Sequence, residues 1–188
     1  MKIAILGWGS LIWQPKDLKF DANIGWKEDG PVLPIEFARI SKGGRLTLVI
    51  TPHGTKVPTL YCISSFDAIN VAISNLKKRE GTVLNYIGYY DKSKNEFHPK
   101  ESPIEENIKN WINTTDLDGV IWTNLPENWE IRNEEKVVIK TIDPNNRIEY
   151  LKKMPKDKRA LAEEYIRNTP KQINTKYRKL IVETLGWD

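Results

Sequence analysis

A glycine turn directly follows the first apolar segment of the chain. Lys2 to Leu6 is predicted to form a buried strand that runs straight into Gly7-Trp8-Gly9-Ser10-Leu11. Neither Gly7 nor Gly9 has a Cβ atom, so the backbone can bend sharply there and present N–H groups to a ligand. Such N–H groups suit a carboxylate or a developing oxyanion. The turn is therefore the first candidate for chemistry.

Two other interpretations of this turn are possible. A dinucleotide-binding loop requires Gly-x-Gly-x-x-Gly, but Ile12 occupies the third glycine position and Pro15 lies where the phosphate-binding helix would start. The sequence therefore argues against a dinucleotide site. A purely structural turn is the second alternative, because a short Gly-x-Gly motif is not specific by itself.

Glu80 is the second candidate. The segment from Phe66 to Glu80 is predicted to be a helix with a stripe of apolar residues, and Glu80 follows Leu76 by four positions, so it extends that stripe. Gly81 is the expected C-terminal cap. A carboxylate on an inward face is costly unless it has partners, and such placement is enriched at functional sites. The alternative is a solvated helix end at which Glu80 pairs with Lys77 or Arg79.

The string Gly7-Trp8-Gly9-Ser10-Leu11-Ile12-Trp13 resembles the N-terminal motif of the γ-glutamylcyclotransferase-like superfamily, which typically reads Gly-Tyr-Gly-Ser-Leu. The resemblance continues through residues 37–41, 44–49 and 76–81 and covers the chain to about residue 90. Trp8 replaces the tyrosine usual in the family, and an indole donates one hydrogen bond but accepts none.

This resemblance implies a metal-independent enzyme without a cofactor that cyclises the γ-glutamyl group of a small amine or peptide to 5-oxoproline and releases the amine. Glu80 would be the catalytic acid/base, and residues Gly7, Trp8, Gly9, Ser10 and Leu11 would contact the substrate. Arg39 is a candidate partner for a substrate carboxylate, with a structural salt bridge as its alternative. A noncatalytic small-molecule binding protein of the same fold is the alternative function.

The predicted elements favour an α+β fold with a mixed or antiparallel sheet. Residues 35–41, 46–51, 86–91, 120–123 and 136–142 are expected strands, with Thr59 to Ile63 as the hairpin partner of 46–51. Expected helices cover residues 102–113, 156–168 and 175–185. Ser102 is the expected N-cap of the first of these helices. The resemblance implies a small mixed β-barrel with helices packed outside. We expect one domain over residues 1–188, with 145–188 as a helical C-terminal extension.

The bulk composition narrows the function classes. With 188 residues, 39% of them hydrophobic, the chain can bury a sizeable core without disulfides or metals. The net charge of +4 is spread along the chain, so no nucleic-acid partner is predicted. A single cysteine fits a reducing compartment such as the cytoplasm, and no apolar run is long enough for a membrane span. The sequence carries no indication of oligomeric state.

The remaining polar candidates have simpler explanations. Cys62 lies in an apolar strand and is expected to be a small buried hydrophobe, while His53 and His98 lack the spacing of a zinc site. Tyr86, Tyr89 and Tyr90 follow Glu80 closely in the sequence. One of these three tyrosines is therefore a candidate to supply a hydroxyl group to the site.

Overall fold

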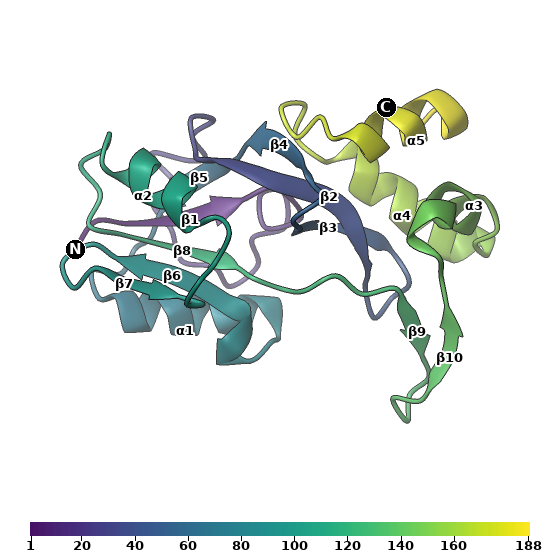
Figure 1. Ribbon diagram of the computed structural model, residues 1–188, viewed down its shortest axis with the longest axis horizontal. Coiled ribbons are helices and arrows are strands. Elements are labelled where there is room, and N and C mark those ends of the chain that lie inside the picture. Colours follow the sequence, from purple (N-terminus) through teal and green to yellow (C-terminus); the bar gives the residue numbers. More distant parts are fainter.

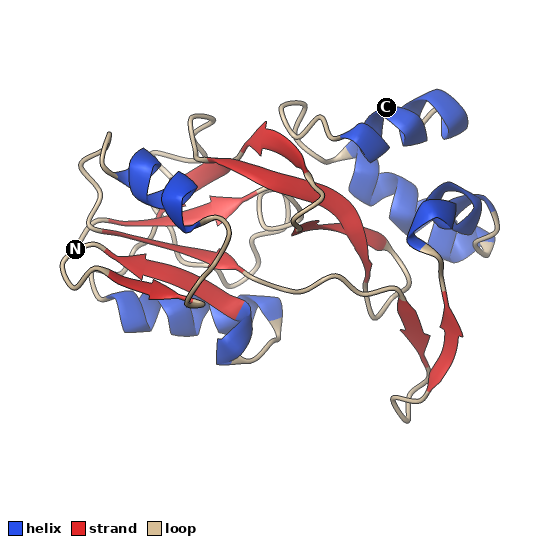
Figure 2. Ribbon diagram, in the orientation of Figure 1, coloured by secondary structure: helices blue, strands red, loops and turns tan.

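The computed structural model describes residues 1–188 as a mixture of strands and helices (Figures 1 and 2). The strands are β1 (Ile3–Gly7), β2 (Val32–Ile40), β3 (Leu46–Ile50), β4 (Thr55–Pro58), β5 (Leu60–Ile63), β6 (Ile87–Asp91), β7 (Glu96–His98), β8 (Gly119–Thr123), β9 (Glu130–Arg132) and β10 (Val138–Thr141). The α-helices are α1 (Ile69–Glu80), α2 (Glu105–Ile112), α3 (Arg147–Lys152), α4 (Lys156–Arg167) and α5 (Lys176–Leu185). None of these helices combines the length and apolarity that crossing a membrane requires.

The central sheet has the strand order β5-β1-β8-β6-β7, and β1 pairs antiparallel with β5 and parallel with β8. Every residue of β1 is buried. Because successive side chains of a strand point to opposite faces, Ile3 and Ile5 pack with α1, while Ala4 and Leu6 join the larger core on the other face. Figure 1 shows α1 running along one face of this sheet. This packing fixes the end of β1, where the glycine turn begins, relative to α1.

A second sheet, with the order β3-β2-β4, contributes to the larger core. That core also contains residues of α2 and of the C-terminal helices α4 and α5. Glu36, buried in β2, holds α5 in place because its carboxylate accepts hydrogen bonds from the Thr175 hydroxyl and the Tyr177 N–H. The C-terminal helices are therefore tied to the sheet that lies beside the glycine turn.

The expected β-barrel is wrong, although the α+β class is correct. The strands form three separate sheets, and none of them closes into a barrel. The free edge of β3 explains the open side: Leu48 there accepts a hydrogen bond from the Trp8 indole and donates its N–H to the Tyr165 hydroxyl, each over 3.4 Å. Side chains of the turn and of α4 thus occupy an edge that a further strand would have to pair with in a barrel.

Residues 59–63 also pair differently from the expected hairpin. β3 pairs with β2, whereas β5 pairs with β1 in the other sheet. The chain passes from one sheet to the other between β4 and β5, at Pro58 and Thr59. Thr59 is held there because its hydroxyl donates to the Pro31 carbonyl over 2.8 Å.

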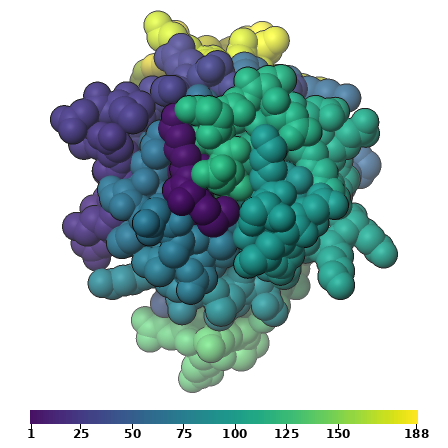
Figure 3. All heavy atoms as spheres, turned by 90° about the vertical axis from the view of Figure 1, so that its left-hand side faces the viewer, coloured from purple at the N-terminus to yellow at the C-terminus, as the bar shows by residue number.

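The start of one helix and the bounds of the last strand also differ from the prediction. Helix α2 begins at Glu105 and its N-cap is Ile104, with no side-chain capping bond, so Ser102 is not the cap. The backbone carbonyl of Ser102 instead accepts the Glu105 N–H over 3.1 Å, which forms a turn ahead of the helix. The last predicted strand is shortened to β10, which pairs with β9 in a hairpin that projects from the body (Figures 1 and 3).

Gly88 in β6 lies directly opposite Trp122 in β8. A Cβ atom at residue 88 would lie 2.1 Å from Cε2 and 2.3 Å from Nε1 of the Trp122 indole, which is fully buried. We expect Gly88→Ala to lower the free energy of unfolding by about 1–3 kcal/mol, the usual cost of overpacking a core. Urea unfolding measures this, with Gly43→Ala as the control because a Cβ atom there meets nothing within 4 Å. Equal stability of the two variants would contradict this packing.

Candidate active site

The glycine turn leaves a row of backbone donors free. After β1, the Ile12 N–H donates to the Gly9 carbonyl over 3.0 Å and the Gln14 N–H to the Ser10 carbonyl over 2.8 Å. The N–H groups of Gly9, Ser10 and Leu11 donate to no acceptor of the protein. Three consecutive free donors in a bend can hold an anionic oxygen.

Both glycines of the turn are required by close packing. A Cβ atom at Gly7 would lie 2.6 Å from Cζ3 of the Trp26 ring, and one at Gly9 would lie 2.4 Å from the Tyr165 hydroxyl oxygen. Real Cβ atoms do not approach other atoms this closely, so a larger residue would displace the ring or the phenol. The turn is thus both a packing element and a row of donors.

Helix α1 brings Glu80 to this turn. Ala72 and Leu76 are buried against the central sheet, and Gly81 ends the helix with a φ of 61°, the left-handed conformation that glycine adopts without strain. Glu80 lies one turn beyond Leu76 on the same stripe, and its side chain is 15% exposed. The inward position predicted for this carboxylate is confirmed.

Glu80 and the turn line one small cavity of about 60 Å³. Its walls are residues 6–11, Arg79 and Glu80 of α1, Thr123 of β8 and Tyr165 of α4. Five predicted contact residues, Gly7 to Leu11, and the predicted acid/base therefore share a site. The elements that meet here are the end of β1, the end of α1 and the end of β8, all held by the central sheet.

Arg79 is the partner of the Glu80 carboxylate, as the alternative interpretation of this helix end expected, although the helix end is largely buried and not solvated. Arg79 Nη1 forms an ion pair with Oε1 of Glu80, and its Nη2 donates to the Gln14 carbonyl over 2.6 Å. The Arg79 side chain is only 6% exposed. The Oε2 atom of Glu80 accepts no hydrogen bond from the protein, so one carboxylate oxygen is free to interact with a ligand.

The tyrosine that lines the cavity is Tyr165, and the sequence does not predict its position. The three candidates from the sequence lie elsewhere: the Tyr89 hydroxyl donates to Glu96 over 2.6 Å, the Tyr90 hydroxyl to Asn95 over 3.2 Å, and Tyr86 is exposed. Tyr165 comes from α4, 85 residues after Glu80, and reaches the turn because α4 packs against the edge of β3.

Burial raises the pKa of Tyr165 to about 12, and the nearby Glu80 carboxylate acts in the same direction. A raised folded-state pKa favours folding while the phenol is protonated, so its contribution is complete below pH 10 and falls as the pH rises toward 12. We expect wild type to lose about 1 kcal/mol more stability between pH 9 and pH 11 than Tyr165→Phe. Urea unfolding at both pH values measures the difference, and identical losses would contradict it.

Arg39 does not line the cavity. Its guanidinium donates to the Pro126 carbonyl over 2.6 Å, and burial lowers its pKa. Arg45, in the β2–β3 hairpin, places its guanidinium 6.0 Å from the centroid of the Tyr165 ring. Arg45 makes no ion pair within the protein. It therefore replaces Arg39 as the candidate partner for a carboxylate outside the cavity.

The other residues singled out in the sequence contribute to packing or hydrogen bonding within the protein. The Trp8 side chain is buried, and its indole N–H is directed to the Leu48 carbonyl. Cys62 is buried in β5, and burial raises the pKa of its thiol. His98 stacks on Tyr89 with ring centroids 5.5 Å apart. No group of three or more His, Cys, Asp and Glu side chains is placed to hold a metal ion.

Comparison with known proteins gives no family for the chain: no family model matches it, and neither curated proteins nor solved structures contain a significant match.

Proposed function

We propose that the protein is a γ-glutamylcyclotransferase-like enzyme that converts the γ-glutamyl group of a small γ-glutamyl amine or peptide to 5-oxoproline. One observation carries this proposal: the Glu80 carboxylate and the glycine turn line the same cavity. The motif resemblance of residues 7–13 supplies the reaction. The geometry supplies the two groups that this reaction needs, a proton carrier and a row of oxyanion donors.

In the proposed reaction, the α-amino nitrogen of the substrate attacks the γ-carbonyl carbon of the same molecule. Glu80 Oε2 takes a proton from the ammonium group, which frees the lone pair for attack. The carbonyl oxygen becomes an oxyanion next to the free N–H groups of Gly9, Ser10 and Leu11. The bond between the γ-carbon and the leaving nitrogen then breaks as the Glu80 carboxyl returns its proton to that nitrogen and the oxyanion re-forms the carbonyl group. The ring nitrogen gives up its second proton to the Glu80 carboxylate, and this proton passes to the released amine, which leaves as an ammonium ion.

The Arg79–Glu80 ion pair has to open for substrate to bind. The cavity holds about 60 Å³, the room of about two water molecules, and Arg79 forms part of its wall. The substrate ammonium then binds Oε2 and replaces the Arg79 guanidinium as the cation that compensates the Glu80 carboxylate. The Tyr165 phenol keeps its proton at neutral pH, because its pKa is raised, and adds a further donor at the turn.

The second candidate function is binding of a γ-glutamyl compound without turnover. The Arg79–Glu80 pair favours this function, because a carboxylate held by a buried arginine is also a structural ion pair. In this case the protein is a small-molecule binding protein with the same pocket. The remaining proposals are location in the cytoplasm, which fits a lone buried thiol, and the absence of a nucleic-acid partner.

The test is an incubation of wild-type protein with a panel of γ-glutamyl amino acids, γ-glutamyl amines and glutathione. We expect 5-oxoproline from at least one compound, together with an equal amount of released amine. Product from none of them, combined with saturable binding of a panel member, would favour the binding protein over the enzyme. If the protein yields no product and binds no member of the panel, both candidate functions are excluded.

A further inference from the structure

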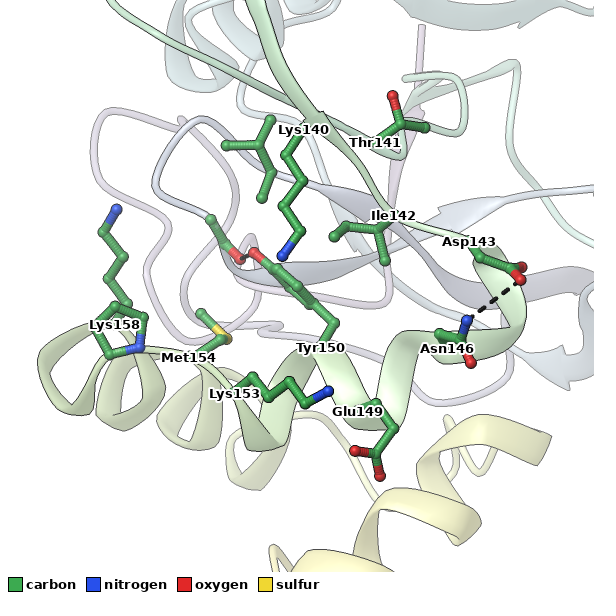
Figure 4. Close-up of a pocket in the computed structure, with 13 residues that line it drawn as sticks. Lys140, Thr141, Ile142, Asp143, Asn146, Glu149, Tyr150, Lys153, Met154 and Lys158 are labelled. Carbon is green, nitrogen blue, oxygen red and sulfur yellow. Dashed lines mark hydrogen bonds between the residues drawn. The ribbon is translucent and has the colours of Figure 1, made fainter.

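A second cavity, of about 480 Å³, lies at the other end of the molecule from α1 (Figures 1 and 4). It is partly open to solvent and is lined by β10 and the segment after it, by α3, by the start of α4 and by Gly44 at the tip of the β2–β3 hairpin. It shares no lining residue with the cavity at Glu80. Its volume falls in the range typical of small-molecule sites.

One part of this cavity is apolar. Ile131, Ile142 and Met154 contribute aliphatic and thioether surface, and the last two are buried. The Tyr150 ring also lines this part and is fixed because its hydroxyl donates to the Gly44 carbonyl. Figure 4 shows this ring and the Met154 side chain facing the same space. Such a wall fits an aromatic or branched aliphatic group.

The polar part of the cavity is positively charged. Lys140, Lys153 and Lys158 line it, and none of the three forms an ion pair with the protein. The two lining carboxylates are already engaged: Glu149 accepts from Lys152 over 2.9 Å, and Asp143 accepts from the Asn145 N–H over 2.8 Å. Because Lys152 pairs with Glu149, the three lysines outnumber the remaining carboxylate, Asp143, and the lining has a net positive charge.

The start of α4 adds backbone donors beside these lysines. Pro155 is the N-cap of α4 and provides no capping side chain, so the first N–H groups of the helix lack acceptors from the protein. Pro155 and Lys158 both line the cavity. The positive end of the helix dipole and the lysines consequently act on the same space.

We propose that this cavity binds a small organic anion, a carboxylate or phosphate monoester with an aromatic or branched aliphatic body. The anionic group lies among Lys140, Lys153, Lys158 and the start of α4, and the apolar body lies against Tyr150, Ile142 and Met154. This site is independent of the proposed activity at Glu80, because the two cavities have no wall in common.

Methyl NMR with phenyl phosphate as the probe tests this site. The chain has two methionines, Met154 in the cavity and Met1 at the opposite end, so methyl-labelled methionine gives one reporter at the site and one remote control. We expect phenyl phosphate to shift the Met154 signal saturably and to leave Met1 unchanged. Inorganic phosphate and phenol, each carrying half of the recognised chemistry, should bind at least about tenfold more weakly.

Substitution of the lysines checks the charge requirement. Lys140→Gln/Lys153→Gln should weaken phenyl phosphate binding by about tenfold or more. Lys78→Gln/Lys92→Gln makes the same change in net charge at exposed residues outside the cavity and should bind like wild type. An unshifted Met154 signal, or equal affinity in the two double variants, would overturn the proposal. Neither result bears on 5-oxoproline formation, so the anion site and the proposed enzymatic activity are tested independently of each other.

Discussion

Glu80→Gln should reduce kcat/KM for 5-oxoproline formation by about 10²–10⁴-fold, because the amide cannot carry the proton from the ammonium group to the leaving nitrogen. The substitution keeps the size and planarity of the side chain and changes only its ability to exchange a proton. Product formation from a γ-glutamyl compound, followed as released 5-oxoproline, measures the loss. Activity within a few-fold of wild type would remove Glu80 from its assigned role.

The controls for this variant must distinguish a loss of catalytic activity from a loss of stability. Glu80→Gln leaves the Arg79 guanidinium buried without its counter-ion, which is destabilising in itself. Arg79→Gln/Glu80→Gln removes both charges and should be as inactive as the single variant but more stable. Glu163→Gln breaks the more exposed ion pair with Arg167 on α4 and should leave activity unchanged. Together these variants assign any loss of activity to the carboxylate.

Gly9→Ala should also lower kcat/KM strongly, by about 10²-fold, because displacement of an active-site group by about 1 Å has an effect of this size. The new Cβ atom would lie 2.4 Å from the Tyr165 hydroxyl oxygen, so either the turn or α4 has to move. Urea unfolding should show a matching loss of stability of about 1–3 kcal/mol.

A second substitution tests the cause of this loss. The next closest atom to the new Cβ is Cζ of Tyr165 at 3.4 Å, an ordinary contact, so Tyr165→Phe removes the clash and leaves the ring in place. Gly9→Ala/Tyr165→Phe should therefore be more stable than Gly9→Ala alone. Gly43→Ala, which meets nothing within 4 Å, is the neutral control. Strictly additive effects of the two substitutions would show that the turn and α4 do not press on each other here.

The parts of the site that follow from local sequence patterns were predictable. The strand before the turn and the stripe of α1 are set by apolar periodicity within a few residues, and this placed Glu80 inward. The glycine after Glu80 marked the end of the helix correctly. Once both elements pack on one sheet, the turn and the carboxylate meet without further information.

The position of Tyr165 and the burial of Arg79 could not be predicted in the same way. Tyr165 reaches the turn because α4 packs against the free edge of β3, a long-range contact that leaves no mark on the helical pattern of residues 156–167. Arg79 follows Leu76 by three positions and was expected only as a partner of Glu80 at a solvated helix end. Its burial depends on the Gln14 carbonyl that it contacts. For Arg39, strand position gave no indication that Pro126 would accept its hydrogen bond.

The barrel expectation was wrong for a related reason. Strand patterns locate strands but not their partners, and β4 and β5 follow each other in the chain while belonging to different sheets. The edge of β3 is satisfied by two side chains, Trp8 and Tyr165, instead of another strand. The same two contacts hold the turn beside α4, so the feature that leaves the sheets open also builds the cavity.

The most direct test of the account is a titration of labelled protein with 5-oxoproline, the proposed product, observed at the backbone amides of the turn and at the Glu80 side-chain carboxyl carbon. The account predicts that the signals of Gly9, Ser10, Leu11 and the Glu80 carboxyl carbon shift together, with one dissociation constant, because they face one cavity. Shifts confined to other parts of the chain, or a response of the turn without a response of Glu80, would contradict a shared site.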